Sequence, residues 1–439
     1  MQKPLIALLI SSALLTINAQ AADLIQVYQQ ALANDATYAS ARAALAAGQE
    51  RTTQGRSGLL PVIGLGGSST KITGDFESKA DDPFGVQSGS RDNSRNQWSL
   101  SLSQPLFRWD RWESYQQSKL SQAATEAVFA QAQQDLITRV AQAYFDVLTA
   151  QDNLSSIQAQ KSATTEQLAS AKRNFEVGTQ TITDTHEAQA AYDLVVAQEF
   201  AAINDLEVKR NALQQIIGTA PASLSTLRPG VTIATPQPAA IEPWIASAEQ
   251  QNYSVVGAQL NLEIAKRDIS RNRAGHLPTL DLVASKGRDS VTASGITKTN
   301  AVGVQWNVPL FNGFAVTSKV RESIALEDKA RNDLEATRRA AAQNARTAFL
   351  GMNSGLAQVR ALEAAEVSSK SALDSNKLGY QVGVRINIDV LNAQRQLYST
   401  QRDLSRARYD TIMNGLRLKS AAGTLKEADL APINELLVK

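Results

Sequence analysis

The sequence predicts a mainly α-helical protein with a small β part, built as two tandem halves that repeat one order of elements: helix, strand, strand, helix, helix. Three observations lead to this prediction. FEVGTQTITDTHEAQ, residues 175–189, returns as YQVGVRINIDVLNAQ at 380–394, with five of fifteen positions identical. From 108 to 177 the chain has neither glycine nor proline, as a long helix requires. Segments near 97 and 302 alternate apolar and polar residues, as half-buried strands do.

Further paired segments keep the same order along the chain and indicate a tandem duplication. RSGLLPVIGL at 56–65 resembles RAGHLPTLDL at 273–282, and QPLF at 104–107 resembles VPLF at 308–311. We expect a first repeat over 22–217 and a second over 244–439. Between them, 218–243 holds five of the twelve prolines and is expected to be a connector with at most one short strand.

Residues 1–21 are expected to be a secretory signal peptide. Lys3 precedes the apolar run LIALLISSALLTI, and Ala19-Gln20-Ala21 has the form of a cleavage site. A membrane anchor is the alternative, but the run is shorter than the ~20 apolar residues that a spanning helix needs. No later segment is apolar enough to span as a helix, so any membrane crossing by the exported chain must use strands.

Composition excludes several function classes. Cysteine is absent among the 439 residues, so disulfides and thiolate sites are excluded. A net charge of +2 gives no reason to expect nucleic acid as a partner. We find no phosphate loop, GxSxG or HExxH motif, and therefore expect neither an enzyme nor a cofactor. His186 and His276 lie in unrelated contexts, and no metal site is expected.

The helices are predicted from length and periodicity. In the helix expected over 108–177, one apolar stripe recurs every four residues: Leu136, Val140, Tyr144 and Leu148. Such a helix would extend ~100 Å, which suits a coiled coil or a tube. Its second copy is expected over about 315–378, with a local irregularity at Gly351 and Gly355. The return helices are expected from Thr179 to Ile217 and from Val384 to Asn414.

Four strands are expected, over about 61–74, 95–106, 278–287 and 299–310. In QWSLSLSQ at 97–104, Trp98, Leu100 and Leu102 face one way and the polar residues face the other. VGVQWNVPL at 302–310 alternates in the same way, with Val302, Val304 and Trp306 on its apolar face. The polar stretches KADDPFG at 79–85 and KGRD at 286–289 are expected in loops that face outside.

This alternation suits either a soluble sandwich or a transmembrane barrel. Aromatic residues near the strand ends favour the barrel because they suit the membrane interface: Trp98, Phe107, Trp109, Trp112, Trp306 and Phe311. Four strands cannot close a barrel, since the smallest membrane barrels use eight. An open sheet edge in lipid would leave backbone groups without partners. If the strands span a membrane, the protein must therefore be an oligomer that pools its strands.

Over essentially its whole mature length, the chain resembles the TolC family of outer-membrane efflux and secretion channels. The resemblance covers both PLF strand ends and both VG…D tips, and YQVGVRINIDVLNAQ at 380–394 is its most specific feature. Lacking a cysteine at the cleavage site, the chain is similar to the non-lipidated TolC branch. The resemblance implies a homotrimer whose twelve strands form one transmembrane β-barrel, continued by a periplasmic α-helical barrel of twelve helices.

The resemblance implies that the two tips form a gated periplasmic mouth. Gly178 and Gly383 are expected to make the helix-to-helix turns, where glycine permits the required φ. Asp184 and Asp389 follow six residues later. An acid there can cap the return helix, whereas three copies of Asp389 around an axis would form a cation-attracting ring. Both interpretations stay open.

Further site residues follow from the resemblance alone. The family carries a second acid three residues after the first, and Asn392 stands at that position. One carboxylate ring instead of two should weaken cation selectivity and metal-ion block. The resemblance also implies that the closed mouth is held by Arg385 with Thr183 and Asp184, and by Tyr380 with Asp184.

The implied location is the outer membrane of a Gram-negative-type cell, with an extension into the periplasm. The implied function is an exit duct for a tripartite efflux pump, a type I protein secretion system, or both. Its partners would be a periplasmic adaptor (membrane fusion) protein, an inner-membrane transporter and outer-membrane lipid. The alternative is a soluble periplasmic coiled-coil scaffold or adaptor, against which the apolar strand faces argue. A secreted helical enzyme is disfavoured by the lack of any catalytic constellation.

Overall fold

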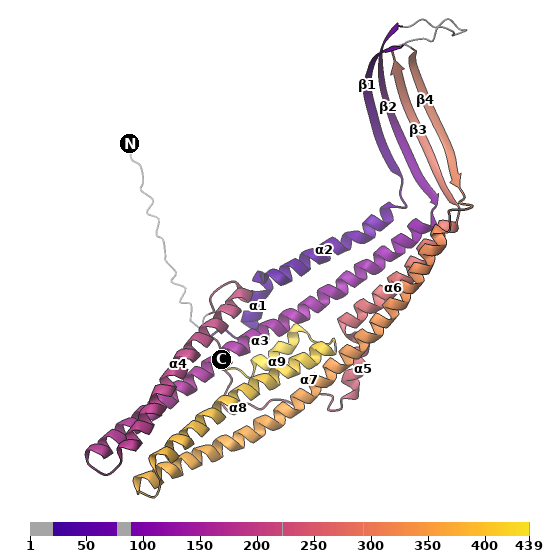
Figure 1. Ribbon diagram of the computed structural model, residues 1–439. Coiled ribbons are helices and arrows are strands. Elements are labelled where there is room, and N and C mark those ends of the chain that lie inside the picture. Colours follow the sequence, from indigo (N-terminus) through magenta and orange to yellow (C-terminus); the bar gives the residue numbers. More distant parts are fainter. Residues whose placement is uncertain (1–20, 77–88, 222, 293, 439) are drawn as a thin grey trace, which may run out of the picture. The chain divides into compact units, whose positions relative to one another are not determined.

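The computed structural model describes residues 21–438 except 77–88, 222 and 293, and its elements follow in two matching series (Figure 1). The bounds of the first series are α1 (Leu24–Asn34), α2 (Ala36–Ser57), β1 (Val62–Phe76), β2 (Gly89–Phe107), α3 (Trp109–Glu176) and α4 (Ile182–Ile217). Those of the second are α5 (Glu242–Gln251), α6 (Tyr253–Arg273), β3 (Thr279–Val291), β4 (Gly295–Asn307), α7 (Ala315–Gln381) and α8 (Asn387–Ala421). The 3-10 helices η1 (Ala274–His276) and η2 (Glu427–Asp429) and the last helix α9 (Leu430–Asn434) complete the chain. The predicted duplication of element order is confirmed.

The first helix of each half is split in two, which the sequence analysis did not anticipate. The splits fall at Asp35 and Asn252, whose side chains accept hydrogen bonds from backbone amides at the start of the next helix. Asp35 Oδ1 accepts from Tyr38 N at 2.6 Å, and Asn252 Oδ1 accepts from Ser254 N at 3.0 Å. Such side chains cap helix N-termini, so each split is set by a local capping residue.

The expected signal peptide lies outside the described residues apart from Ala21. In the described part of the chain, no helix combines the length and apolar character that crossing a membrane requires.

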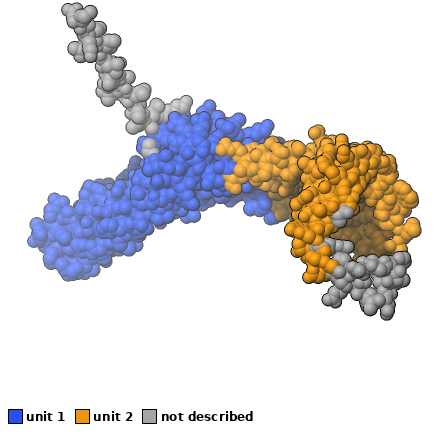
Figure 2. Space-filling model, turned by 90° about the horizontal axis from the view of Figure 1, so that it is seen from above, with its two compact units in different colours: residues 1–39, 132–248, 342–439 blue, residues 40–131, 249–341 orange. Residues whose placement is uncertain are grey.

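Figure 2 colours the two compact units of the chain, each formed by segments from both halves. The first unit comprises residues 1–39, 132–248 and 342–439, and the second comprises 40–131 and 249–341.

The core of the first unit surrounds the middle of α3. The predicted stripe is confirmed, since Leu136, Val140, Tyr144 and Leu148 are each 0% exposed. The Tyr144 hydroxyl donates to the Ser225 carbonyl at 2.7 Å and to the Ala22 carbonyl at 3.2 Å. Burial raises the pKa of this phenol. The expected connector forms no strand in its described residues; it makes two isolated bridges instead, Ala22–Leu224 and Leu227–Leu437.

The expected irregularity in the second long helix is wrong, because α7 runs without a break through Gly351 and Gly355. These glycines allow α8 to approach closely instead. A Cβ on Gly355 would collide with the Thr411 side chain, and one on Gly351 would lie 3.2 Å from Asn414 Nδ2. The cost of glycine in a helix is offset here by tight packing between two helices.

The second unit holds one antiparallel sheet in the order β1-β2-β3-β4 (Figure 1). Residues that are direct partners across an antiparallel pair share a face. One face is apolar over several rows: Leu280 opposite Trp306; Leu282 opposite Val304; and Ile63, Leu102, Ala284 and Val302 in register. The other face carries small and polar residues, such as Gly64, Ser101, Ser285 and Ala301 in register. The alternation predicted for two strands therefore extends across all four.

Several strand ends differ from expectation, among them the start of β4 at Gly295. β2 begins at Gly89, because it stays paired with β1 as far as Phe76. β4 ends at Asn307, before Pro309, whose missing N–H cannot extend the ladder. KGRD, expected in a loop, lies inside β3, and only residues 292–294 separate β3 from β4. KADDPFG lies outside the described residues.

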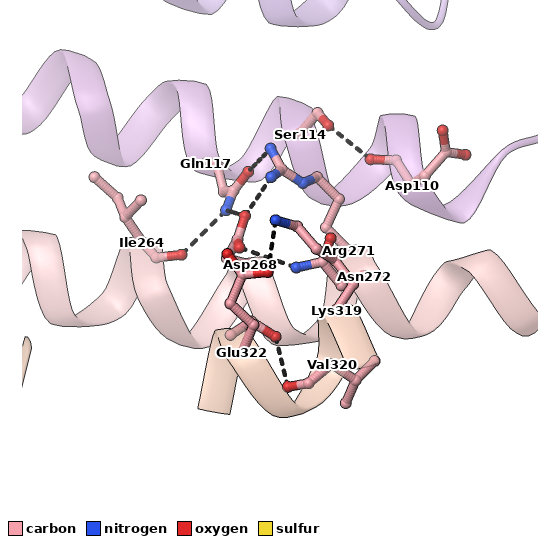
Figure 3. Close-up of polar contacts among 11 residues, drawn as sticks. Asp110, Ser114, Gln117, Ile264, Asp268, Arg271, Asn272, Lys319, Val320 and Glu322 are labelled. Carbon is pink, nitrogen blue, oxygen red and sulfur yellow. Dashed lines mark hydrogen bonds and ion pairs between the residues drawn. The ribbon is translucent and has the colours of Figure 1, made fainter. Parts of the chain in front are cut away.

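Polar side chains join α3 to α6 in the second unit. Figure 3 shows Asp268 between Arg271 and Asn272 of its own helix, with Gln117 of α3 beside it. Gln117 donates to the Ile264 carbonyl at 3.1 Å and accepts from Arg271 at 3.1 Å. This network fixes α6 against the start of α3.

Candidate functional site

The two hairpin tips of the first unit end their long helices in the same way. Gly178 has φ +74° and Gly383 has φ +78°. Thr179 N donates to the Asn174 carbonyl at 2.9 Å, and Val384 N donates to the Gly379 carbonyl at 2.8 Å. Each pattern is a Schellman motif with glycine in the left-handed position. The tip turns therefore take up the residues expected at the start of the return helices, so α4 begins at Ile182 and α8 at Asn387.

The return helices begin differently. In the first tip, Thr181 is the N-cap, and it forms a reciprocal capping box with Asp184. The Asp184 carboxylate accepts from the Thr181 amide at 3.1 Å and from its hydroxyl at 2.8 Å. In the second tip the N-cap is Ile386, which has no side-chain capping bond. Asp389 therefore takes no part in a capping box, and it forms an ion pair with Arg385 at 3.7 Å.

Contacts between the tips involve residues that the sequence analysis missed. The Tyr380 hydroxyl donates to Gln180 Oε1 at 2.7 Å. Asn387, which is 0% exposed, donates to the Asp184 carbonyl at 3.0 Å and accepts from Gln167 Nε2 at 2.6 Å. One signal was available: Asn387 is a polar residue where the first half has Ile182, and buried polar residues need partners.

Within one copy of the chain, the residues expected to hold the closed mouth have other partners, and the expected pairs stay a prediction for the assembled mouth. Tyr380 bonds to Gln180 rather than to Asp184, and Arg385 pairs with Asp389 rather than with Thr183 or Asp184. The physical reason is local, because the capping box holds the Asp184 carboxylate on its own helix. Asp184 still joins the second tip, through its backbone carbonyl and Asn387.

Asn392 is exposed one turn beyond Asp389, and its Oδ1 accepts from Arg395 at 3.2 Å. It also borders a groove of about 460 Å³ between the first hairpin and α8. Arg402 and Gln160 line the same groove and are 3.3 Å apart. Burial lowers the pKa of Arg402. Gln394 also lines this groove, and its Oε1, which is buried from solvent, has no hydrogen-bond partner among the described residues. The groove is therefore lined by several polar side chains.

The tips also expose apolar side chains. Val177, Val382, Val384 and Ile386 are 62–78% exposed. Exposed apolar clusters of this kind mark contact surfaces.

The aromatic residues expected at a membrane interface lie near the two ends of the apolar face of the sheet. Phe107 and Trp306 both stand opposite Leu280, at one end of the face. Trp98 lies on the same face, nine residues before Phe107. Trp109 is the first residue of α3, and Phe311 packs edge-on against Phe314 at 5.5 Å between centroids. Trp306 and Phe311 are 71% and 77% exposed.

The chain is similar to known proteins over almost its whole length. The outer membrane efflux protein family matches residues 27–219 and 244–424. The outer membrane protein TolC of Vibrio cholerae is 35% identical over 441 residues, which cover 98% of each chain. The proteases secretion protein PrtF of Dickeya chrysanthemi is 32% identical over 429 residues, covering 94% of this chain and 90% of that protein.

Solved structures share the fold at lower identity. The outer membrane protein VceC of Vibrio cholerae has a TM-score of 0.77 at 20% identity, covering 91% of this chain and 96% of that one. The CmeC outer membrane channel of Campylobacter jejuni has a TM-score of 0.79 at 18% identity, covering 94% and 89%.

Proposed function

The chain belongs to the outer membrane efflux protein family, and from this premise we propose that it works as a homotrimeric channel with a gated periplasmic mouth. It is an outer-membrane protein that extends into the periplasm. Its function is that of an exit duct for efflux pumps and type I secretion. Three copies would supply twelve strands to one barrel, and their helices would form the tunnel.

One observation carries this proposal: in the rows from Leu280 to Ala284, the sheet has one apolar face and one face of mostly small and polar residues. Val302 is 80% exposed and Leu65 is 75% exposed on the apolar face, with no core beneath them in the chain's described residues. A soluble protein would bury such a face. A barrel wall presents it to lipid and turns the polar face to water.

The tips supply the proposed mouth. Three copies of Asp389 around an axis would place three carboxylates at the constriction, where a ring of acids attracts cations. The bonds Tyr380–Gln180 and Asn387–Asp184 would hold the second hairpin against the first in the closed state. Opening would require these bonds to break.

The proposed partners are a periplasmic adaptor and an inner-membrane transporter. Without a nucleotide-binding motif, the duct depends on a transporter for energy. The exposed tip side chains Val382, Val384 and Ile386 and the polar groove between the first hairpin and α8 are the surfaces that adaptor helices would contact.

The decisive experiment is single-channel recording of the detergent-purified mature protein in a planar bilayer. We expect discrete, cation-preferring conductance steps, with divalent cations blocking from the tip side only. A protein that stays soluble without detergent and never inserts would instead support the periplasmic scaffold. Discrete steps without cation preference would retain the channel and reject the acid ring.

A further inference from the structure

Three cations stand on the apolar face of the sheet. Arg288 and Lys298 are direct partners in the β3–β4 register, and Lys286 is two residues from Arg288 on the same strand. On β2, Trp98 is the partner of Arg288, and Leu100 is the partner of Lys286. All three cations are exposed. We call Lys286, Arg288 and Lys298 the basic patch.

The basic patch lies at one edge of the apolar face. On β3, eight residues separate Leu280, in the row of Phe107 and Trp306, from Arg288. Eight residues extend ~26 Å along a strand, or ~20 Å along the membrane normal at a tilt of ~40°. This distance approaches the ~25 Å apolar band of membrane barrels. Lysine and arginine at this depth can reach lipid headgroups with their long side chains.

The charges of the basic patch are not neutralised by the described part of the sheet. Like charges directly opposite each other, such as Arg288 and Lys298, destabilise an antiparallel pair. On the polar face, Arg95 pairs with Asp289 at 2.6 Å, and at the base of the sheet Arg108 pairs with Asp281 at 2.6 Å. Among the described residues of the apolar face, Lys71 pairs with Asp92. This ion pair does not include a cation of the basic patch. An external anion would remove the repulsion.

We propose that the basic patch binds the phosphate groups of anionic lipid headgroups in the adjoining membrane leaflet. Arginine and lysine are the side chains that bind phosphate, and Trp98 is an aromatic ring suited to the interface beside them. The inference rests on the proposed function, since it requires the strands to cross a membrane. It assigns a role to KGRD, whose two cations lie on the strand face and not in a loop.

Electron paramagnetic resonance of spin-labelled lipids tests the proposal. The trimer is reconstituted in phosphatidylcholine vesicles with a trace of spin-labelled phosphatidic acid or spin-labelled phosphatidylcholine. The motionally restricted signal reports lipid in contact with the protein. We expect phosphatidic acid to be enriched at the protein surface about threefold or more over phosphatidylcholine, with the enrichment falling in 1 M salt.

The variant K286Q/R288Q/K298Q should reduce this enrichment to about onefold, and each single substitution should lower it in part. The matched control K319Q/K329Q/R339Q removes the same charge from exposed ion pairs on α7 and should retain the enrichment. Inorganic phosphate, added at constant ionic strength, distinguishes the sources. A lipid site should keep its enrichment, whereas a site for free phosphate should lose it.

The outcomes separate this inference from the proposed function. Absence of any restricted lipid would overturn both, because no strand would face a membrane. Restricted lipid with equal amounts of both headgroups would overturn only the basic patch. Equal loss of enrichment in the control variant, or full retention in K286Q/R288Q/K298Q or in all three single variants, would also overturn it.

Discussion

The two hairpin tips end their long helices identically but start their return helices differently. Gly178 and Gly383 form the same Schellman turn. Beyond it, Thr181 and Asp184 cap α4, whereas Ile386 leaves α8 without a side-chain cap. The duplicated aspartates therefore differ in their contacts: Asp184 is held in a capping box, whereas Asp389 takes part in none and lies 3.7 Å from Arg385. A repeated motif does not carry a repeated role when one neighbouring residue changes.

The largest expected effect is the loss of divalent block when Asp389, but not Asp184, is replaced. Asp389→Asn should weaken divalent block of the channel by about tenfold or more, the change that ~1.4 kcal/mol of lost attraction gives. Asp184→Asn is the matched control and should leave block nearly unchanged, because its carboxylate is held by Thr181. Block is measured as the divalent concentration that halves single-channel current. Equal effects of the two substitutions would refute the division of roles.

Adding an acid should sharpen the difference between the tips. Asn392→Asp places a second carboxylate one turn from Asp389, so three copies would add a second ring. We expect divalent block to strengthen about fivefold, from additional Coulomb attraction in a narrow aqueous site. The control is Ala190→Asp, which adds an acid at an exposed position of α4 in the other hairpin. If block responds to Ala190→Asp and not to Asn392→Asp, the constriction lies elsewhere.

The bond between the tips should control the resting conductance. Tyr380→Phe removes the donor to Gln180, together with the acceptor of the weak 3.5 Å hydrogen bond from Asn174 Nδ2. Gln180→Leu removes the acceptor, so both variants lose the Tyr380–Gln180 hydrogen bond of ~1 kcal/mol. We expect each variant to raise the open fraction about threefold to fivefold. The double variant should do little more than either single one, because both remove the same bond. Fully additive effects would show that the two residues act separately.

The missing cap of α8 can be built. Ile386→Thr would recreate the Thr-x-x-Asp sequence of the first tip, with Asp389 at the third helical position. The new cap should stabilise the tip by ~0.5–1 kcal/mol, measured as slower hydrogen exchange of the first α8 amides. It should also weaken divalent block about twofold, since the cap would draw the Asp389 carboxylate toward the backbone. Unchanged exchange and block would mean that α8 cannot accept this cap.

Sequence patterns predicted the repeat, the buried stripe on α3 and the alternating strand faces because each depends on local periodicity. The partners of Tyr380 and Asn387 were not predictable in the same way. They depend on how two hairpins, about 205 residues apart in sequence, meet side by side. The irregularity predicted at the glycines of α7 was wrong for a related reason. Helix propensity is a local property, whereas Thr411 and Asn414 approach these glycines from another helix. KGRD was misassigned because polar composition suggested a loop, whereas the β3–β4 ladder continues through it.

The last prediction concerns the Schellman turns that the two tips share. Substituting the glycine should have the same effect in both tips. Gly178→Ala and Gly383→Ala each force a Cβ into the left-handed region, which costs ~1–2 kcal/mol. Neither Cβ would meet an atom within 4 Å, so the cost should come from the backbone alone and be equal in both tips. Hydrogen exchange of the Thr179 and Val384 amides, which close the two Schellman turns, should accelerate by the same factor. An acceleration more than about threefold larger at one tip would show that this turn is held by more than its backbone, and that the tips differ before their return helices begin.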